Sequence, residues 1–93
     1  MSPEEELRRA ERAKQILNDE IFSEAVQQIR DGLLLGLRNT AFKDVKLMEK
    51  LCQRYCVLED MIGLLQSTME TGEFAKQEIE RLSLIEKAKE FFN

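Results

Sequence analysis

The clearest pattern in the chain is a heptad repeat of apolar residues in its second half. Its members are spaced alternately three and four residues apart: Met48, Leu51, Tyr55, Leu58, Ile62, Leu65 and Met69. Spacing of this kind predicts a helix over residues 44–70 that packs along one face against a neighbouring helix. Further apolar residues beside this stripe widen it, so we expect two neighbours instead of one: Leu47, Cys52, Met61 and Leu64.

A second helical stripe precedes the first. Apolar residues again recur at intervals of three or four: Phe22, Val26, Ile29, Leu33 and Leu37. This spacing predicts a helix over residues 20–38, which follows a break at Asn18-Asp19, where either residue can cap the next helix. Ser2 and Pro3 with the glutamates after them are typical of a helix start, so residues 3–17 are expected to form a helix as well.

The segment from Gly32 to Gly36 is unusual for a soluble helix. Each glycine inside a helix costs about 1 kcal/mol relative to alanine, and two glycines four residues apart lie on the same face and leave a notch. One interpretation is that another helix crosses this notch closely, as in small-residue motifs of membrane helices. The alternative is a locally weakened helix. Leucines 33–35 between the glycines point to nearly all sides, which indicates burial on nearly all sides.

Two further breaks complete the expected architecture. Residues 39–42 predict a turn, and Thr71-Gly72 predicts the end of the third helix, because glycine readily adopts the left-handed conformation that ends many helices. A last helix is expected over residues 74–92. The sequence therefore predicts one all-α domain over residues 1–93, with four helices at about 3–17, 20–38, 44–70 and 74–92. The second and third of them would form a helical hairpin.

The amount of apolar helix surface leads us to expect a homo-oligomer, most simply a two-fold dimer. A chain of 93 residues has little interior in which to hide such surface. Two aromatic residues close to position 93 suggest docking onto the same chain or a sister chain, since terminal residues are usually mobile. The expected oligomer interface consists of Gly32, Leu33, Leu34, Leu35, Gly36, Leu37, Met48, Leu51, Tyr55, Leu58, Ile62, Leu65, Met69, Phe91 and Phe92.

Composition and charge exclude several classes of protein. A hydrophobic fraction of 43% excludes a disordered acidic tail, and no apolar run approaches the roughly 20 residues of a membrane span. The acidic beginning of the chain is unlike the basic start of a signal peptide, so we expect a cytoplasmic protein. The net charge of −4 argues against a general affinity for nucleic acid or for anionic membranes.

The charge is unevenly distributed along the sequence. Residues 38–54 contain two acidic side chains and five basic ones, whereas residues 59–80 contain six acidic side chains and one lysine. The basic zone is a candidate contact for phosphate or for an acidic partner, through Arg38, Lys43, Lys46, Lys50 and Arg54. Opposite zones can also orient self-association. The alternative interpretation is a pair of solvated helix faces.

Residues for catalysis are scarce. The chain has no histidine, which is the commonest general base and metal ligand, and no glycine-rich phosphate loop or catalytic triad. Cys52 and Cys56 lack the further ligands that a zinc site requires. We therefore expect a protein that is not an enzyme and holds no cofactor or metal.

Three stretches of the sequence resemble a class of small helical proteins encoded by bacteriophages and prophages. They are residues 13–25 (AKQILNDEIFSEA), residues 46–51 (KLMEKL) and residues 70–72 (ETG). The resemblance implies a short list of roles: virion structure or assembly, inhibition of a host factor or sequestration of a signalling nucleotide, or DNA packaging and regulation. It also implies a place in the host cell or virion and, besides self-association, a phage or host protein as partner.

Overall fold

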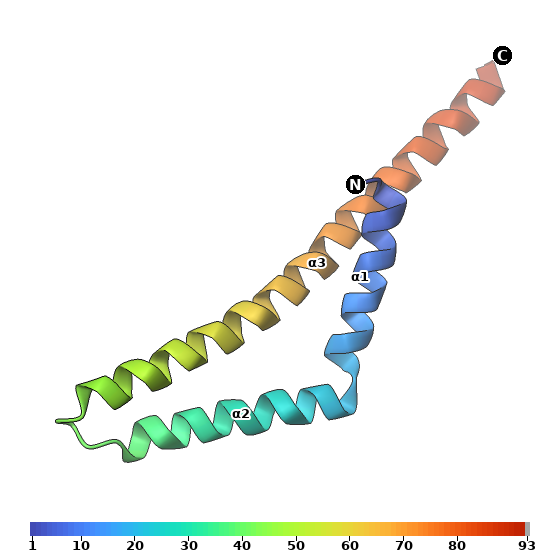
Figure 1. Cartoon of the computed structure of the whole chain (residues 1–93). Coiled ribbons are helices and arrows are strands. Elements are labelled where there is room, and N and C mark those ends of the chain that lie inside the picture. Colours follow the sequence, from blue (N-terminus) through green and yellow to red (C-terminus); the bar gives the residue numbers. More distant parts are fainter. Residues whose placement is uncertain (93) are drawn as a thin grey trace. The chain divides into compact units, whose positions relative to one another are not determined.

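The protein is all-α. The computed structural model describes residues 1–92, with side chains described for residues 1–90, and contains three helices (Figure 1). These are α1 (Pro3–Asn18), α2 (Glu20–Asn39) and α3 (Val45–Phe92). The described residues contain no β-strand. The all-α prediction is confirmed, whereas the prediction of four helices is wrong because the third and fourth are one continuous helix.

The error lies at Gly72. Residues 71 and 72 lie within α3, and no glycine in the described chain has a positive φ, so Gly72 does not adopt the left-handed conformation that ends a helix. Gly72 is instead buried, and a β-carbon on it would overlap the β-carbon of Ala10. The glycine therefore permits a close helix crossing, which a sequence pattern cannot distinguish from a helix end.

The three helix starts agree with the sequence analysis. Ser2 Oγ accepts a hydrogen bond from the backbone N–H of Glu5 at 3.2 Å. Asp19 Oδ1 accepts one from Phe22 N–H at 2.8 Å and acts as the N-cap of α2. Asp44 Oδ1 accepts one from Leu47 N–H at 3.1 Å. Each side chain satisfies an N–H group that has no partner within the first turn of a helix.

The contacts divide the chain into two units. The hairpin unit is Ile16–Leu64, which contains α2 and the first part of α3. Its buried residues are Val26, Leu33 and Leu58, and four half-buried residues pack against them: Phe22, Leu51, Tyr55 and Ile62. Four members of the heptad stripe, Leu51, Tyr55, Leu58 and Ile62, thus pack against the apolar stripe of α2 within one chain. Residues 40–44 connect the two helices, and Thr40 donates a hydrogen bond to the carbonyl of Gly36 there.

The second unit comprises Met1–Gln15 and Leu65–Asn93, of which residues up to 92 are described. We call it the alanine unit, because its buried residues besides Gly72 are Ala10, Ala13 and Ala75. Side chains of this size let the backbones of α1 and α3 approach closely. They also remove little apolar surface from water, so the unit gains little stability from burial.

Candidate interaction surface

One side of the hairpin unit is polar and is held by an ion pair. Arg30 Nη2 and Arg30 Nε each lie 2.9 Å from Glu59 Oε1, which joins α2 to α3. Gln27 accepts a further hydrogen bond from Arg30 at 3.4 Å and donates one to Asp31 at 2.7 Å. The ion pair shows that the edge of α2 that carries Arg30 and the edge of α3 that carries Glu59 lie on the same side of the hairpin.

The opposite side is apolar. Because successive residues of a helix are about 100° apart, Ile29 and Arg30 lie on opposite edges of the buried stripe of α2. Val57 and Glu59 flank Leu58 on α3 in the same way. Since Arg30 pairs with Glu59, Ile29 and Val57 lie together on the other side of the hairpin unit.

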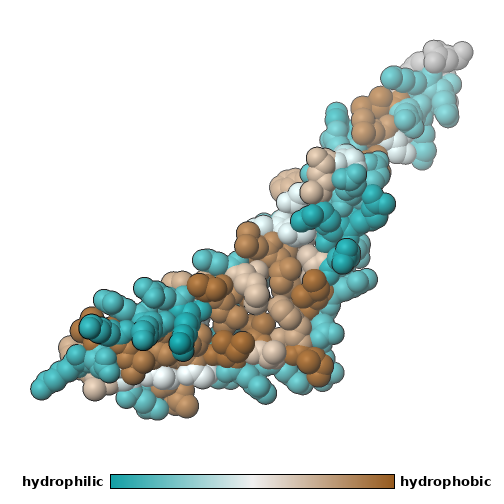
Figure 2. All heavy atoms as spheres, viewed as in Figure 1, coloured by the Kyte–Doolittle hydropathy of each residue, from teal (hydrophilic) through white to brown (hydrophobic). Residues whose placement is uncertain are grey.

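This second side is called the apolar face. Its members recur at intervals of three or four residues along each helix. On α2 they are Ile21, Ala25, Ile29, Gly32 and Gly36, and on α3 they are Leu47, Lys50, Arg54, Val57, Met61 and Leu64. Four of the apolar side chains are more than half exposed: Ile21 at 72%, Ile29 at 53%, Val57 at 68% and Leu64 at 71%. Figure 2 shows hydrophobic atoms exposed along the hairpin of α2 and α3.

The two glycines of the predicted notch have different surroundings. A β-carbon on Gly36 would lie 3.3 Å from Leu51 Cδ1, so this glycine accommodates a leucine side chain of the same chain. A β-carbon on Gly32 would have no neighbour within 4 Å. Among the described residues, no helix crosses Gly32, and this part of the notch is open.

The structure separates the predicted interface residues into covered and uncovered ones. Leu33 is buried and Leu37 half-buried, whereas Leu34 and Leu35 are 46% and 56% exposed. The seven residues of the heptad stripe are all half-buried or buried within the chain, so they offer less free surface than the sequence analysis assigned to them. The side chains of Phe91 and Phe92 lie outside the described residues.

Sequence reasoning did not assign Ile21, Ile29 or Val57 to an interface. A signal was present, since a second series with alternating spacings of three and four runs from Leu47 to Leu64 beside the main stripe. Two cations, Lys50 and Arg54, interrupt its apolar character and conceal it.

The five predicted basic contacts do not converge on one site. Lys50 and Arg54 line an open hollow on α3 together with Gln53 and Val57. Arg38 lines a different hollow on α2, with Asp31 and two exposed leucines. Lys43 and Lys46 are exposed and line neither hollow. A single phosphate group would therefore meet two of these cations at most in either hollow.

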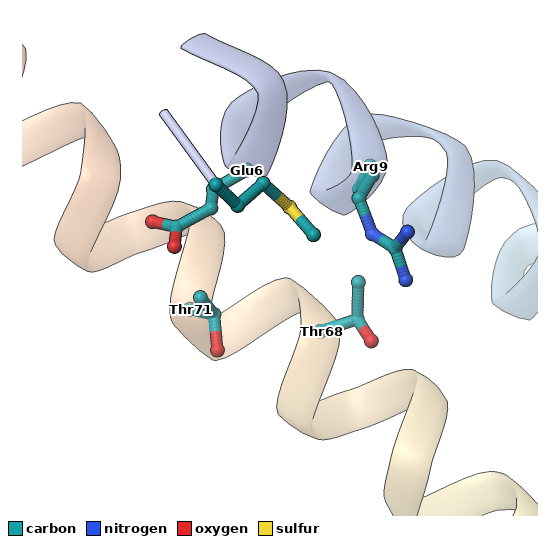
Figure 3. A pocket seen from close by; sticks show the side chains of 5 residues that line it. Glu6, Arg9, Thr68 and Thr71 are labelled. Carbon is teal, nitrogen blue, oxygen red and sulfur yellow. The ribbon is translucent and has the colours of Figure 1, made fainter. Parts of the chain in front are cut away.

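The alanine unit also contains a shallow hollow. Glu6 and Arg9 on α1 and Thr68 and Thr71 on α3 line it together with Met1 (Figure 3). Thr71 donates its hydroxyl hydrogen to the carbonyl of Ser67 at 2.9 Å, within its own helix.

Metal-binding and membrane-spanning features are not found in the described part of the chain. Cys52 and Cys56 are free and exposed. No cluster of three or more histidine, cysteine or acidic side chains within residues 1–92 is arranged to hold a metal ion. Over the same residues, no helix combines the length and the apolar character needed to cross a membrane.

No protein-family model, curated protein or solved structure matches this chain.

Proposed function

We propose that this protein is a non-enzymatic helical protein that acts by docking onto other chains, in the first place onto copies of itself. One observation carries the proposal. Among the described residues, sixteen large apolar side chains are exposed, whereas only six apolar residues are buried, three of them alanines. Contiguous exposed apolar surface in a soluble protein marks an interaction site more often than an ordinary solvated surface.

The position of the exposed residues supports docking as opposed to a small-molecule site. Fourteen of the sixteen lie along the helices, for example Ile29 and Val57 on the apolar face, and they do not line an enclosed cavity. Long apolar stripes on helices are suited to contact with other helices. A homodimer is the simplest assembly that would cover such stripes, because one patch then meets its own copy.

The finer proposal is a structural or assembly role in a phage particle, located in the host cytoplasm or in the virion. Its support is the resemblance of residues 13–25 and 46–51 to small phage proteins, together with the exposed apolar helix surface. A phage or host protein would then be the further partner. Helix-to-helix contact alone is sufficient for such a role and requires no cofactor.

Two other roles receive less support from the geometry. Sequestration of a signalling nucleotide or blocking of a host factor would use the basic residues, but Arg38 and the pair Lys50 and Arg54 line separate hollows. A DNA-packaging or regulatory role would require a strongly basic surface, and the net charge of the chain is −4.

Thermal unfolding at several protein concentrations tests the docking function. Because a self-associating protein is stabilised by mass action, the unfolding midpoint should rise as the concentration increases from 1 to about 100 µM. A midpoint that is independent of concentration would contradict self-association. For the finer proposal, the protein should be detected by mass spectrometry in purified virions, and its absence there would contradict a structural role.

A further inference from the structure

We infer that the apolar face of the hairpin unit docks onto the same face of a second copy, with the two hairpins running in opposite directions about a two-fold axis. This inference rests on the proposed function. It names the surface through which the chain associates with itself and the relative orientation of the two copies. It selects one side of the hairpin unit over the other, and a second copy of this chain over any other partner.

The first argument comes from packing. A pair of helices covers only one side of each helix, and the buried part of the hairpin unit consists of Val26, Leu33 and Leu58. So small a buried group contributes little free energy to folding. The apolar face is the remaining uncovered side on which apolar residues recur along both helices, interrupted on α3 by Lys50 and Arg54. Ala25 and the open position at Gly32 leave space for another helix to approach.

The second argument comes from charge. The half of the hairpin unit near the connection, residues 31–54, has five basic and three acidic side chains, a net charge of +2. The other half, residues 16–30 and 55–64, has one basic and five acidic side chains, a net charge of −4. The unit therefore has a positive end and a negative end.

These charges favour one orientation. When two copies pack in opposite directions, the positive end of each faces the negative end of the other, and both contacts are attractive. Packing in the same direction would place like charges together, which is unfavourable. Lys50 and Arg54 are themselves members of the apolar face on α3. Their positions therefore allow contact with the partner's acidic end. A self-complementary surface of this kind fits a second copy.

A matched pair of variants tests the surface. Ile29 and Leu35 lie on the same helix, and their side chains are similarly exposed, at 53% and 56%. Ile29 belongs to the apolar face and Leu35 does not. In sedimentation equilibrium, I29E should raise the dimer dissociation constant at least tenfold, because it places a carboxylate within an apolar contact. L35E should change the constant less than threefold.

A neutralised variant tests the orientation. In the antiparallel arrangement, K50Q/R54Q removes attractions and should weaken the dimer several-fold, and added salt should weaken the wild-type dimer more than the variant. In a parallel arrangement, the same substitutions would remove repulsion and strengthen the dimer. Strengthening would therefore overturn the inferred orientation.

The outcomes separate this inference from the proposed function. A dimer weakened by L35E but not by I29E would keep self-association and overturn the assigned face. A wild-type chain that is monomeric would contradict self-association itself. Circular dichroism checks that both variants keep the helical content of the wild type. If I29E fails to fold, V57Q, at a side chain that is 68% exposed, replaces it with the same expected direction.

Discussion

Gly72 of α3 lies directly against Ala10 of α1. A β-carbon on Gly72 would stand 3.5 Å from the Ala10 Cα and 3.7 Å from the carbonyl oxygen of Glu6, and would overlap the Ala10 β-carbon. The approach of the two helices thus depends on the absence of a side chain at position 72. This contact makes the alanine unit sensitive to the addition of a single methyl group.

We expect G72A and G63A to change stability in opposite directions. Gly63 also lies inside α3, but a β-carbon on it would meet no atom within 4 Å, so G63A should stabilise the protein by about 0.5–1 kcal/mol through helix propensity. G72A gains the same propensity but forces α1 and α3 apart, which should cost about 1–3 kcal/mol. Chemical denaturation followed by circular dichroism measures both values.

The control for this pair of variants transfers the methyl group of Ala10 in α1 to position 72 in α3. The double variant A10G/G72A should recover part of the stability lost in G72A, because the two β-carbons no longer overlap. If G72A were as stabilising as G63A, the close contact between Gly72 and Ala10 would be refuted.

The N-cap of α2 should contribute measurably to stability. D19A removes the acceptor of the Phe22 N–H hydrogen bond, which is 2.8 Å long, and should cost about 1 kcal/mol. D19N keeps a capping oxygen and should cost less than half as much. Equal losses for the two variants in urea denaturation would show that capping is not the role of Asp19.

The ion pair on the polar side of the hairpin unit should contribute only modestly. The side chains of Arg30 and Glu59 are 28% and 40% exposed, so solvent screens their attraction, and E59Q should cost about 0.5 kcal/mol. A double-mutant cycle with R30Q isolates the pair, and its coupling energy should shrink in 1 M salt. A coupling energy that does not change with salt would contradict this assignment.

The pair Glu78–Arg81 gives α3 a local pH response. The hydrogen bond from Arg81, at 2.6 Å, and its positive charge lower the pKa of Glu78 below the ordinary glutamate value of 4.5. A lowered pKa means that the pair supports the helix above pH 4.5 and that this support is lost as the pH falls through the Glu78 pKa. NMR titration should show the lowered pKa, and R81Q should return it toward 4.5; an unchanged value would refute the pairing.

The sequence predicted the structure correctly where a local pattern is compatible with only one structural role. Asp19 and Ser2 are capping residues in a suitable context, and they lie where α2 and α1 begin. The heptad stripe from Met48 to Met69 has a periodicity that only a helix produces, and α3 contains all of it. Short-range rules of this kind act within a few residues, so they are readable without knowledge of the tertiary structure.

The sequence was misleading where one residue type has two uses. Glycine ends helices and also permits close helix crossings, and the partner that distinguishes the two uses at Gly72 is Ala10, 62 positions away. The same limitation applies to the apolar face. Its extent depends on which stripe of α3 packs against α2, and the long-range pair of Arg30 and Glu59 reveals that choice.

The central claim is that the chain associates with itself through surface that it does not cover alone. Light scattering coupled to size-exclusion chromatography at micromolar concentration tests this claim most directly. The account predicts a particle of about twice the 10.9 kDa chain mass, or a larger multiple of it. A particle of 10.9 kDa that persists at about 100 µM protein would contradict the account.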